Sequence, residues 1–258
     1  GGSGADTTAA EPEATTTTAP DVRTLAPTDA LDLALDRLRT AGTFTYQGTS
    51  LATDVSPIRP GVWLTVELTH TGEADLAAGE LHDIGVADDG RATETVTDGT
   101  IVWGREADSV EALDDTGYLT IGAPSEVPEP SGALLLPTWL EAATTVEDLP
   151  DDGSGLRRLR VVVPADVFGV IVDGEPAVDA EVVLGLDTTG NPVRVEVGTI
   201  GGPPLRLTLD LVLGAPVVVD VPEPPATDDA TTTDDSTGDA DADDGIGTGT
   251  GDTSDTGD

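Results

Sequence analysis

Residues 180–211 read AEVVLGLDTTGNPVRVEVGTIGGPPLRLTLDL and contain three runs in which an apolar side chain stands at every second position. Successive side chains of a β-strand point to opposite faces, so each run predicts a strand with one apolar and one polar face. The turn sequences at 187–190 and 201–204 are short, which predicts antiparallel pairing. Two further strands are predicted beside them, at 159–163 and, after the turn at 214–216, at 217–221.

The N-terminal part of the chain predicts one helix followed by more strands. The helical spacing i, i+3, i+4, i+7 is met by Leu31, Ala34, Leu35 and Leu38. We expect Thr28 to cap this helix, Asp29 to lie in its first turn and Gly42 to follow its end. Period-two patterns then appear at 44–46 and 62–69, which predicts strands that are wet on one face.

A hairpin and a second helix are predicted farther along the chain. Asp98-Gly99 stands between the apolar runs 92–96 and 101–103, and this dipeptide is typical of a two-residue type I′ turn. A shorter helix is predicted from the apolar residues Trp139, Leu140, Ala143 and Val146, with Pro137 in its first turn. Two short helices are few for so wide a sheet, so a sheet with one apolar face must close, curl or enclose something.

Composition divides the chain into three parts. Residues 1–27 are Gly, Ala, Thr, Pro and acids, which predicts a flexible tether. Residues 28–222 carry the periodic patterns and form the predicted domain. Residues 223–258 hold 12 of the 50 acidic residues and no basic residue, which predicts a disordered acidic tail.

The charge and the missing residue types exclude several functions. The 258 residues include 50 acids, 11 bases that are all Arg, and no Cys or Met, for a net charge of −39. Without Cys and Lys, the chain has no disulfide, thiol nucleophile, Schiff base or P-loop lysine. Nucleic acid is excluded as a partner because binding would need cations against phosphates. Such charge is tolerable where salt screens it, which favours a saline or alkaline external medium.

Candidate catalytic and metal sites are weak. His70 and His82 lack the spacing that places two ligands on one helix face, and we expect both to be surface polar residues. Ser154 lies in an acidic turn, and carboxylate pairs have no specificity in so acidic a chain. Residues 239–245 place carboxylates as a calcium loop does, but the Gly comes one residue late and Thr250 replaces the bidentate Glu. We therefore expect no catalytic group, metal or cofactor.

Two clusters leave alternatives open. Arg157, Arg158 and Arg160 form the only basic cluster, and could hold a phosphate or a sugar acid. Structural ion pairs with neighbouring carboxylates are the favoured interpretation. The three tryptophans, Trp63, Trp103 and Trp139, are conspicuous in a chain with 3% aromatic residues, and core packing or the lining of a ligand cavity would explain them.

A resemblance to a family adds to these patterns. Segments 39–44, 71–74 and 97–103, followed by 163–168, 180–184, 190–194 and 214–222, resemble in order and spacing the actinobacterial LppX/LprG envelope lipoproteins, which are related in fold to LolA and LolB. The resemblance covers about residues 30–222. It implies an α+β fold, in which a curved antiparallel half-barrel has a few short helices on its concave side.

The same resemblance implies a function. The chain is expected to be a non-enzymatic, monomeric, extracytoplasmic protein that binds acyl chains of lipids or glycolipids for transport across the envelope. A lipidated Cys at the mature N-terminus is implied, although the sequence contains no Cys. The alternative is an envelope sensor or interaction module with the same fold and a closed cavity. The residues expected to line the cavity, chosen by strand face, are Phe44, Leu64, Val66, Ile101, Trp103, Trp139, Leu140, Val161, Val182, Leu184, Val195 and Leu209.

Overall fold

The computed structural model describes residues 21–55, 63–122, 128–168, 178–201 and 205–222. The strands are β1 (Thr43–Val55), β2 (Trp63–Asp75), β3 (Glu80–Ala87), β4 (Ala92–Thr97), β5 (Val102–Ala107), β6 (Leu119–Gly122), β7 (Thr145–Asp148), β8 (Arg157–Val163), β9 (Ala180–Leu186), β10 (Pro192–Thr199) and β11 (Arg206–Leu213). The α-helices are α1 (Pro27–Ala41), α2 (Pro128–Glu141) and α3 (Ala165–Phe168), and the short 3₁₀ helices are η1 (Val22–Thr24) and η2 (Val110–Asp115).

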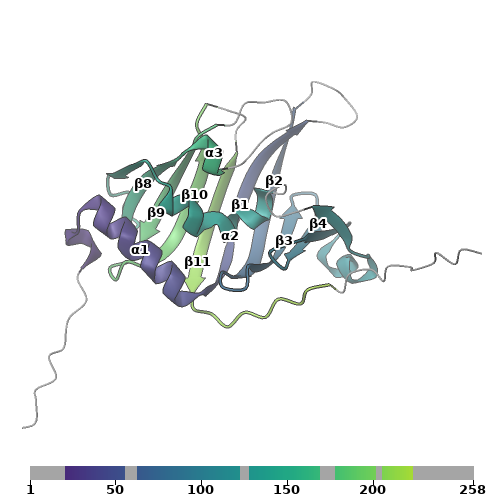
Figure 1. The fold of residues 1–258 in the computed structure, drawn as a ribbon. Coiled ribbons are helices and arrows are strands. Elements are labelled where there is room, and N and C mark those ends of the chain that lie inside the picture. The colour runs from purple at the N-terminus through teal and green to yellow at the C-terminus, as the bar shows by residue number, and fades with distance from the viewer. Residues whose placement is uncertain (1–20, 56–62, 123–127, 169–177, 202–204, 223–258) are drawn as a thin grey trace, which may run out of the picture. The chain divides into compact units, whose positions relative to one another are not determined.

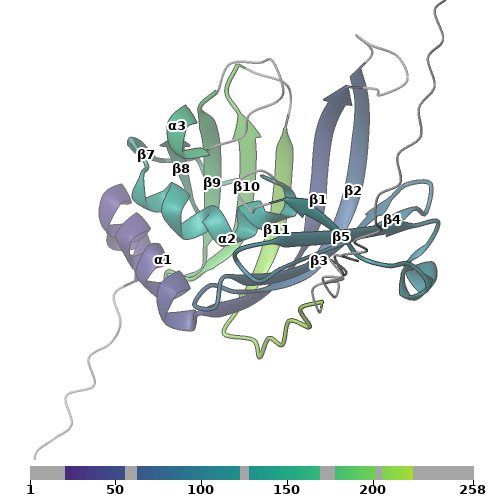
Figure 2. The ribbon, with the colours of Figure 1, turned by 45° about the vertical axis from the view of Figure 1, so that its right-hand side comes forward.

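These strands form a single antiparallel sheet in the order β6-β5-β4-β3-β2-β1-β11-β10-β9-β8-β7. Two meanders, β1–β6 and β7–β11, are joined where the first strand pairs with the last, Tyr46 opposite Leu211. Strands β6 and β7 remain as the two edges, so the curved sheet does not close, and helices α1 and α2 lie on its concave side (Figures 1 and 2). The predicted half-barrel is confirmed.

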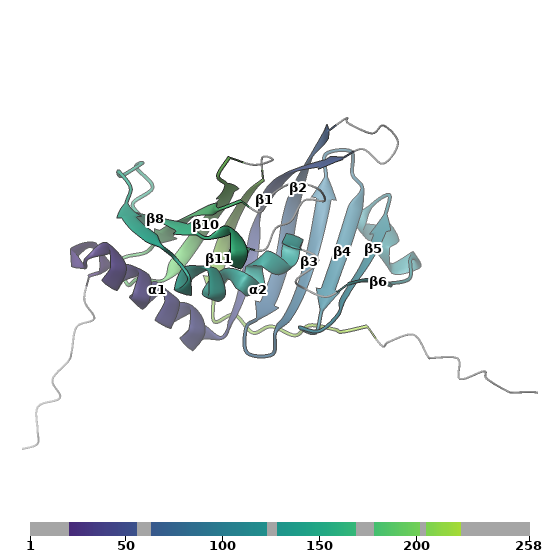
Figure 3. The ribbon, with the colours of Figure 1, turned by 45° about the horizontal axis from the view of Figure 1, so that its top comes forward.

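The order of the strands explains why α2 crosses the concave face. The chain leaves β6 at one edge of the sheet and must reach β7 at the other edge. Helix α2 belongs to this crossover and packs on β2, β3 and β8, and also on α1 (Figure 3). A helix between the two edges covers apolar strand residues that would otherwise face water.

Helix α1 is confirmed, but its predicted start is wrong. Ala26 precedes the first turn and gives no side-chain cap, while Pro27 occupies the first helical position. Proline suits that position because its missing N–H would have no partner there. Gly42 follows the last turn with φ of 71°, as predicted for the end of the helix.

Helix α2 differs from the prediction at both ends. It begins at Pro128 and ends at Glu141, so Pro137 lies inside it and Val146 lies in β7, opposite Val161. A proline inside a helix removes one hydrogen bond and costs about 3 kcal/mol. The side chains of Leu136, Trp139 and Leu140 are buried on either side of it, and their packing offsets this cost.

The predicted hairpin is present with a longer loop. Thr97 pairs with Val102, so residues 98–101 connect β4 and β5, in place of a two-residue turn. The Asp98 carboxylate accepts hydrogen bonds from the amides of Thr100 (2.8 Å) and Ile101 (2.9 Å). These bonds satisfy the loop amides and stabilise the wider turn.

The strand predicted at 217–221 is not formed. Both sides of β11 are already paired, with β1 and β10, so no edge is free beside it. Residues 214–222 instead leave the end of β11 as an extended segment without a strand partner (Figure 3). Alternate residues from Ala215 to Val221 are half-buried, which accounts for the strand-like pattern.

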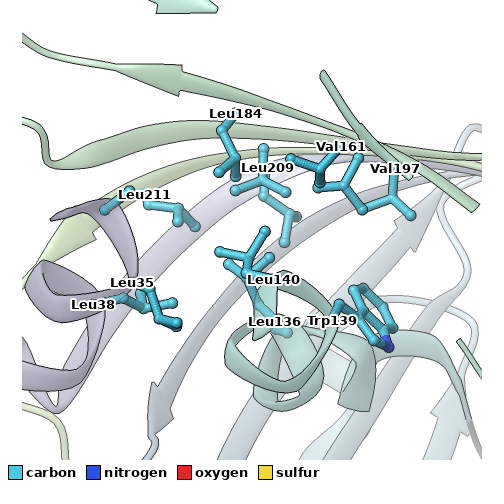
Figure 4. Packing of buried hydrophobic residues seen from close by; sticks show 14 of the residues in the cluster. Leu35, Leu38, Leu136, Trp139, Leu140, Val161, Leu184, Val197, Leu209 and Leu211 are labelled. Carbon is cyan, nitrogen blue, oxygen red and sulfur yellow. The ribbon is translucent and has the colours of Figure 1, made fainter. Parts of the chain in front are cut away.

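The core lies between the helices and the strands β8–β11 and β1 (Figure 4). Leu184 pairs with Leu159 and Val195, and Val195 pairs with Leu209, so one row of apolar side chains crosses four strands. Leu35 and Leu38 from α1 and Leu136 and Leu140 from α2 pack in the same cluster. Burial of these chains contributes about 25 cal/mol per Å² of apolar surface.

Candidate functional site

The concave face has two halves of different composition. In the half formed by β1 and β8–β11, the inward positions hold Leu, Val and Phe, and helices cover them. Eight of the residues expected to line a cavity belong to this packed cluster: Phe44, Trp139, Leu140, Val161, Val182, Leu184, Val195 and Leu209. None of the eight is more than 4% exposed. In this structure they fill the core, and a lipid-binding role for them remains a prediction.

The other half of the concave face is built from short and polar side chains. Following the pairing from β2 to β5, the inward positions include Gly72, Gly85 and Gly104, with His70 and Asp83 between them. Thr93 and Thr95 face inward from β4. A hollow of about 370 Å³ lies over β2–β6 in this half, where Thr93, Thr95 and Gly104 are among its lining residues.

The rim of this hollow is apolar and exposed. Leu119 and Ile121 of the edge strand β6 line it and are 73% and 52% exposed, and Leu68 of β2 lines the opposite side. A Cβ added to Gly104 would lie 2.3 Å from the Ile121 side chain, so this glycine allows Ile121 to lie against the sheet. Exposed leucine and isoleucine beside a hollow are typical of a binding surface.

A hydrogen-bonded chain of four buried side chains lies at the hollow, and two of its members, His70 and Asp83, line it. The Tyr46 hydroxyl donates to Asp83 Oδ1 (2.8 Å), and His70 Nδ1 lies 2.9 Å from Asp83 Oδ2. His70 Nε2 lies 2.8 Å from Ser50 Oγ. Burial, followed by the negative charge of Asp83, raises the pKa of Tyr46 well above its usual value, so its hydroxyl stays a donor.

The connectivity Ser50–His70–Asp83 is that of a hydrolytic triad, but its orientation is reversed. In a triad the serine faces the substrate and the carboxylate lies behind the histidine. Here His70 and Asp83 line the hollow, whereas Ser50 does not line it and is 2% exposed. The carboxylate therefore faces the space that a ligand can enter, and the arrangement provides a hydrogen-bond acceptor in place of a nucleophile.

The prediction that His70 is a surface residue is wrong. Its side chain is 4% exposed, and its ring lies against Gly85, which is its partner on β3 and has no side chain to displace it. A signal was present in the sequence: apolar residues occupy even positions from 62 to 68, and position 70 continues that inward series.

His82 lies on the convex face in a second polar cluster and is half-buried. Its Nε2 lies 2.7 Å from Glu94 Oε1, and Glu94 also pairs with Arg105. Burial opposes ionisation of Glu94, but hydrogen bonds from Arg105, His82 and Tyr118 hold its pKa below the usual value. The Arg105 guanidinium lies 4.5 Å from the Tyr118 ring centre and donates to the Leu113 carbonyl of η2. This cluster fastens η2 to the convex face.

Two residues expected on the concave face lie elsewhere. Ile101 belongs to the loop before β5 and is 37% exposed. Trp103 is buried, but its paired positions across the sheet are Val96, His82, Glu73 and Thr45. This row lies on the face opposite Phe44, so the expectation that Trp103 faces inward is corrected. The inward positions of β5 are Val102, Gly104 and Glu106, which pair with Thr97, Thr95 and Thr93, so the apolar character of Trp103 did not indicate its face.

Some of the residues singled out in the sequence lie outside the described ranges, and the clustered arginines lie within them. Trp63, Leu64 and Val66 are in β2, but their side chains lie outside the described part of the chain, as do residues 1–20, the predicted acidic tail and the calcium-like loop. Residues 21–27, predicted as part of the tether, instead belong to the folded domain: Val22 is fully buried, and its amide donates to the Thr188 carbonyl (3.3 Å). The three clustered arginines are paired with carboxylates, as favoured: Arg157 with Asp148 (2.8 Å), Arg158 with Asp152 (3.4 Å) and Arg160 with Glu147 (3.4 Å) and Glu181.

The described residues contain no cluster of His, Asp and Glu with the geometry of a metal site. Within the same ranges, no helix has both the length and the apolar character needed to cross a membrane.

The chain is similar in fold to LppX. This lipoprotein from Mycobacterium tuberculosis is 14% identical, with a TM-score of 0.49, and the match covers 75% of this chain and 97% of LppX. LprF from Mycobacterium bovis matches with 13% identity, the same coverage and a TM-score of 0.42. A LolA superfamily protein from Nitrosomonas europaea matches with 9% identity, covering 73% of this chain and 92% of that one, with a TM-score of 0.29.

No family model and no curated protein matches the sequence. These solved structures come from the families that the sequence resembles. At this level of identity, their similarity to this chain concerns the fold alone.

Proposed function

We propose that this protein binds the acyl chain of an amphiphilic lipid on the concave face of its half-barrel. The observation that carries the proposal is the hollow over β2–β6, which is open, curved and rimmed by exposed Leu119 and Ile121. Each methylene that leaves water there contributes about 0.8 kcal/mol, so a long chain binds without any catalytic residue.

The volume limits what the hollow holds. Its 370 Å³ is near the lower end of the range of about 300–1,000 Å³ that small-molecule sites occupy. That space suits one acyl chain with a small head group. We further propose that the protein acts outside the cytoplasm as a lipid carrier of the envelope, held near the membrane through its N-terminal segment.

The test combines lipid extraction with a variant that fills the hollow. Protein purified from its own envelope is extracted, and acylated molecules are identified by mass spectrometry. Thr95→Phe places a ring in the hollow, whereas Thr49→Phe places the same ring at an exposed position on the convex face of β1. We expect the wild type and T49F to yield the same acylated molecule and T95F to yield at most a tenth as much. Equal recovery from both variants, or no acylated molecule from any, overturns the proposal.

An interaction module with a closed cavity is the second candidate. It is favoured by the tight packing of the aliphatic half of the concave face, where the eight expected lining residues are buried against helices. Under this alternative the hollow contacts a protein, and Leu119→Asp abolishes capture of that protein while T95F and wild type retain no lipid.

A further inference from the structure

The charged side chains around the hollow indicate which lipid head groups it can accept. The charged side chains that face it on the concave side are the carboxylates of Asp83 and Glu106. Among the described residues that line the hollow, Arg105 is the one arginine, and its side chain lies on the opposite face, paired with Glu94. His70 also lines the hollow, but its two ring nitrogens are engaged by Asp83 (2.9 Å) and Ser50 (2.8 Å). A phosphate or sulfate in the hollow would therefore lie beside two carboxylates without a cation to balance it.

Asp83 is arranged to accept hydrogen bonds from a ligand. Each of its carboxylate oxygens already accepts one hydrogen bond, from Tyr46 or from His70. A carboxylate offers about four acceptor positions, so one position on each oxygen stays available. The two partners hold the carboxylate in a fixed orientation beside the hollow, which Asp83 lines together with His70 and Thr95.

The surroundings strengthen the effect of these carboxylates. Residues 28–222 carry 34 acids and 10 arginines, so the domain itself is strongly negative. Arg91 lies 3.6 Å from Glu106, but it also pairs with Asp89 at 2.9 Å and does not line the hollow. The field at the hollow therefore favours a head group without negative charge.

We propose that the hollow selects an amphiphile with an uncharged, hydroxyl-bearing head, whose hydroxyl donates to Asp83 while its acyl chain lies along Leu68, Leu119 and Ile121. This inference rests on the proposed function, because it concerns the same hollow. It excludes anionic phospholipids as preferred ligands.

The test measures binding of three probes to delipidated full-length protein by titration calorimetry at low ionic strength. Monolauroylglycerol has an uncharged head with hydroxyls, dodecyl phosphate has an anionic head, and methyl laurate lacks the hydroxyls. We expect dodecyl phosphate to bind at least about tenfold more weakly than monolauroylglycerol, with a smaller ratio in molar salt. Methyl laurate should bind at least about threefold more weakly than monolauroylglycerol, because it has no hydroxyl to donate to Asp83.

Variants separate the head-group effect from general charge. Glu106→Gln removes an exposed carboxylate at the hollow, and Asp210→Asn removes one from the convex face of β11. E106Q should reduce the preference for monolauroylglycerol over dodecyl phosphate, measured as the ratio of their dissociation constants, by about threefold. D210N should leave this ratio unchanged. Asp83→Asn should narrow it further, and E106Q keeps the test decisive if D83N does not fold.

Each outcome has a distinct meaning. Equal affinities for monolauroylglycerol and dodecyl phosphate in the wild type, or tighter binding of the phosphate, overturn the head-group inference and leave the proposed function standing. Failure of all three probes to bind overturns the proposed function and the inference with it. Equal effects of E106Q and D210N show that net charge, rather than the hollow, sets the preference, which also overturns the inference.

Discussion

Replacing Leu184 by alanine distinguishes a packed core from an open lipid cavity. Leu184 is fully buried in the middle of the row that runs through Leu159, Val195 and Leu209. The substitution removes three carbons, which at about 0.8 kcal/mol each amounts to roughly 2.4 kcal/mol of transfer free energy. The cavity left among fixed neighbours adds about 1 kcal/mol or more, so we expect a loss of about 3–4 kcal/mol in the free energy of unfolding.

The assay is urea unfolding of the delipidated wild type and variant in the same salt. With a slope of about 2–3 kcal/mol per molar urea for a domain of this size, the midpoint should fall by about 1–2 M at an unchanged slope. Ile121→Ala is the matched control at the rim of the hollow, where the side chain is half exposed, and it should cost about 1 kcal/mol or less.

A loss of less than about 1 kcal/mol in the free energy of unfolding of L184A contradicts a packed core at this position. Leu184 would then line open space, as the sequence alone suggested, and the packed half of the concave face would be the lipid site. A loss similar to that of I121A has the same meaning, because it removes the difference between the two halves of the face.

Three further predictions follow from other parts of the structure. The folded state holds the pKa of Glu94 below its unfolded value, so the stability that Glu94 contributes is complete above the unfolded pKa and is lost as pH falls through the folded pKa. Glu94→Gln should lower the free energy of unfolding by about 1–3 kcal/mol at neutral pH and weaken its decrease between about pH 5 and 3. An unchanged decrease over that pH range contradicts this prediction. Gly190 has φ of 88°, and a Cβ there would lie 2.6 Å from the Leu33 side chain, whereas Gly153 has φ of 84° with open space around it. In urea unfolding, Gly190→Ala should lower the free energy of unfolding by about 2–4 kcal/mol, and Gly153→Ala by about 1–2 kcal/mol from backbone strain alone. Equal losses would show that the contact with Leu33 does not affect stability. The net charge of −39 implies repulsion in the folded state, so the melting temperature should rise by at least a few degrees from low to molar salt; identical melting curves would exclude this.

The strands were predictable wherever the two faces of the sheet differ. The runs at 159–163, 193–197 and 205–211 alternate because one face packs against helices and the other is more exposed, whereas in β9 the convex-face residue Val183 is buried as well. The same alternation misled at 217–221, since a segment lying on the protein surface also buries every second residue. Alternation reports burial of one side, and the presence of a pairing partner depends on the order of the other strands.

The buried polar chain was missed because residue type was weighed before position. His70 and Asp83 are separated by 12 residues, and neither belongs to a recognised motif. Both continue inward series, His70 after Leu68 and Asp83 after Leu81, so position alone indicated burial. Their contact with each other depends on the register between β2 and β3, which no local pattern contains.

The location of the hollow follows from a property that a search for apolar lining residues does not detect. Long apolar side chains on an inward face attract helices and pack against them, so the residues chosen for their hydrophobicity became core. Space remains beside the short inward residues Thr93, Thr95 and Gly104, which come together only after β4 and β5 pair. In a one-sided curved sheet, inward glycine and threonine positions are therefore better indicators of a ligand site than leucine and valine. The polar chain from Tyr46 to Ser50 supports this view, because a buried Asp and His need partners and space that an aliphatic core does not provide.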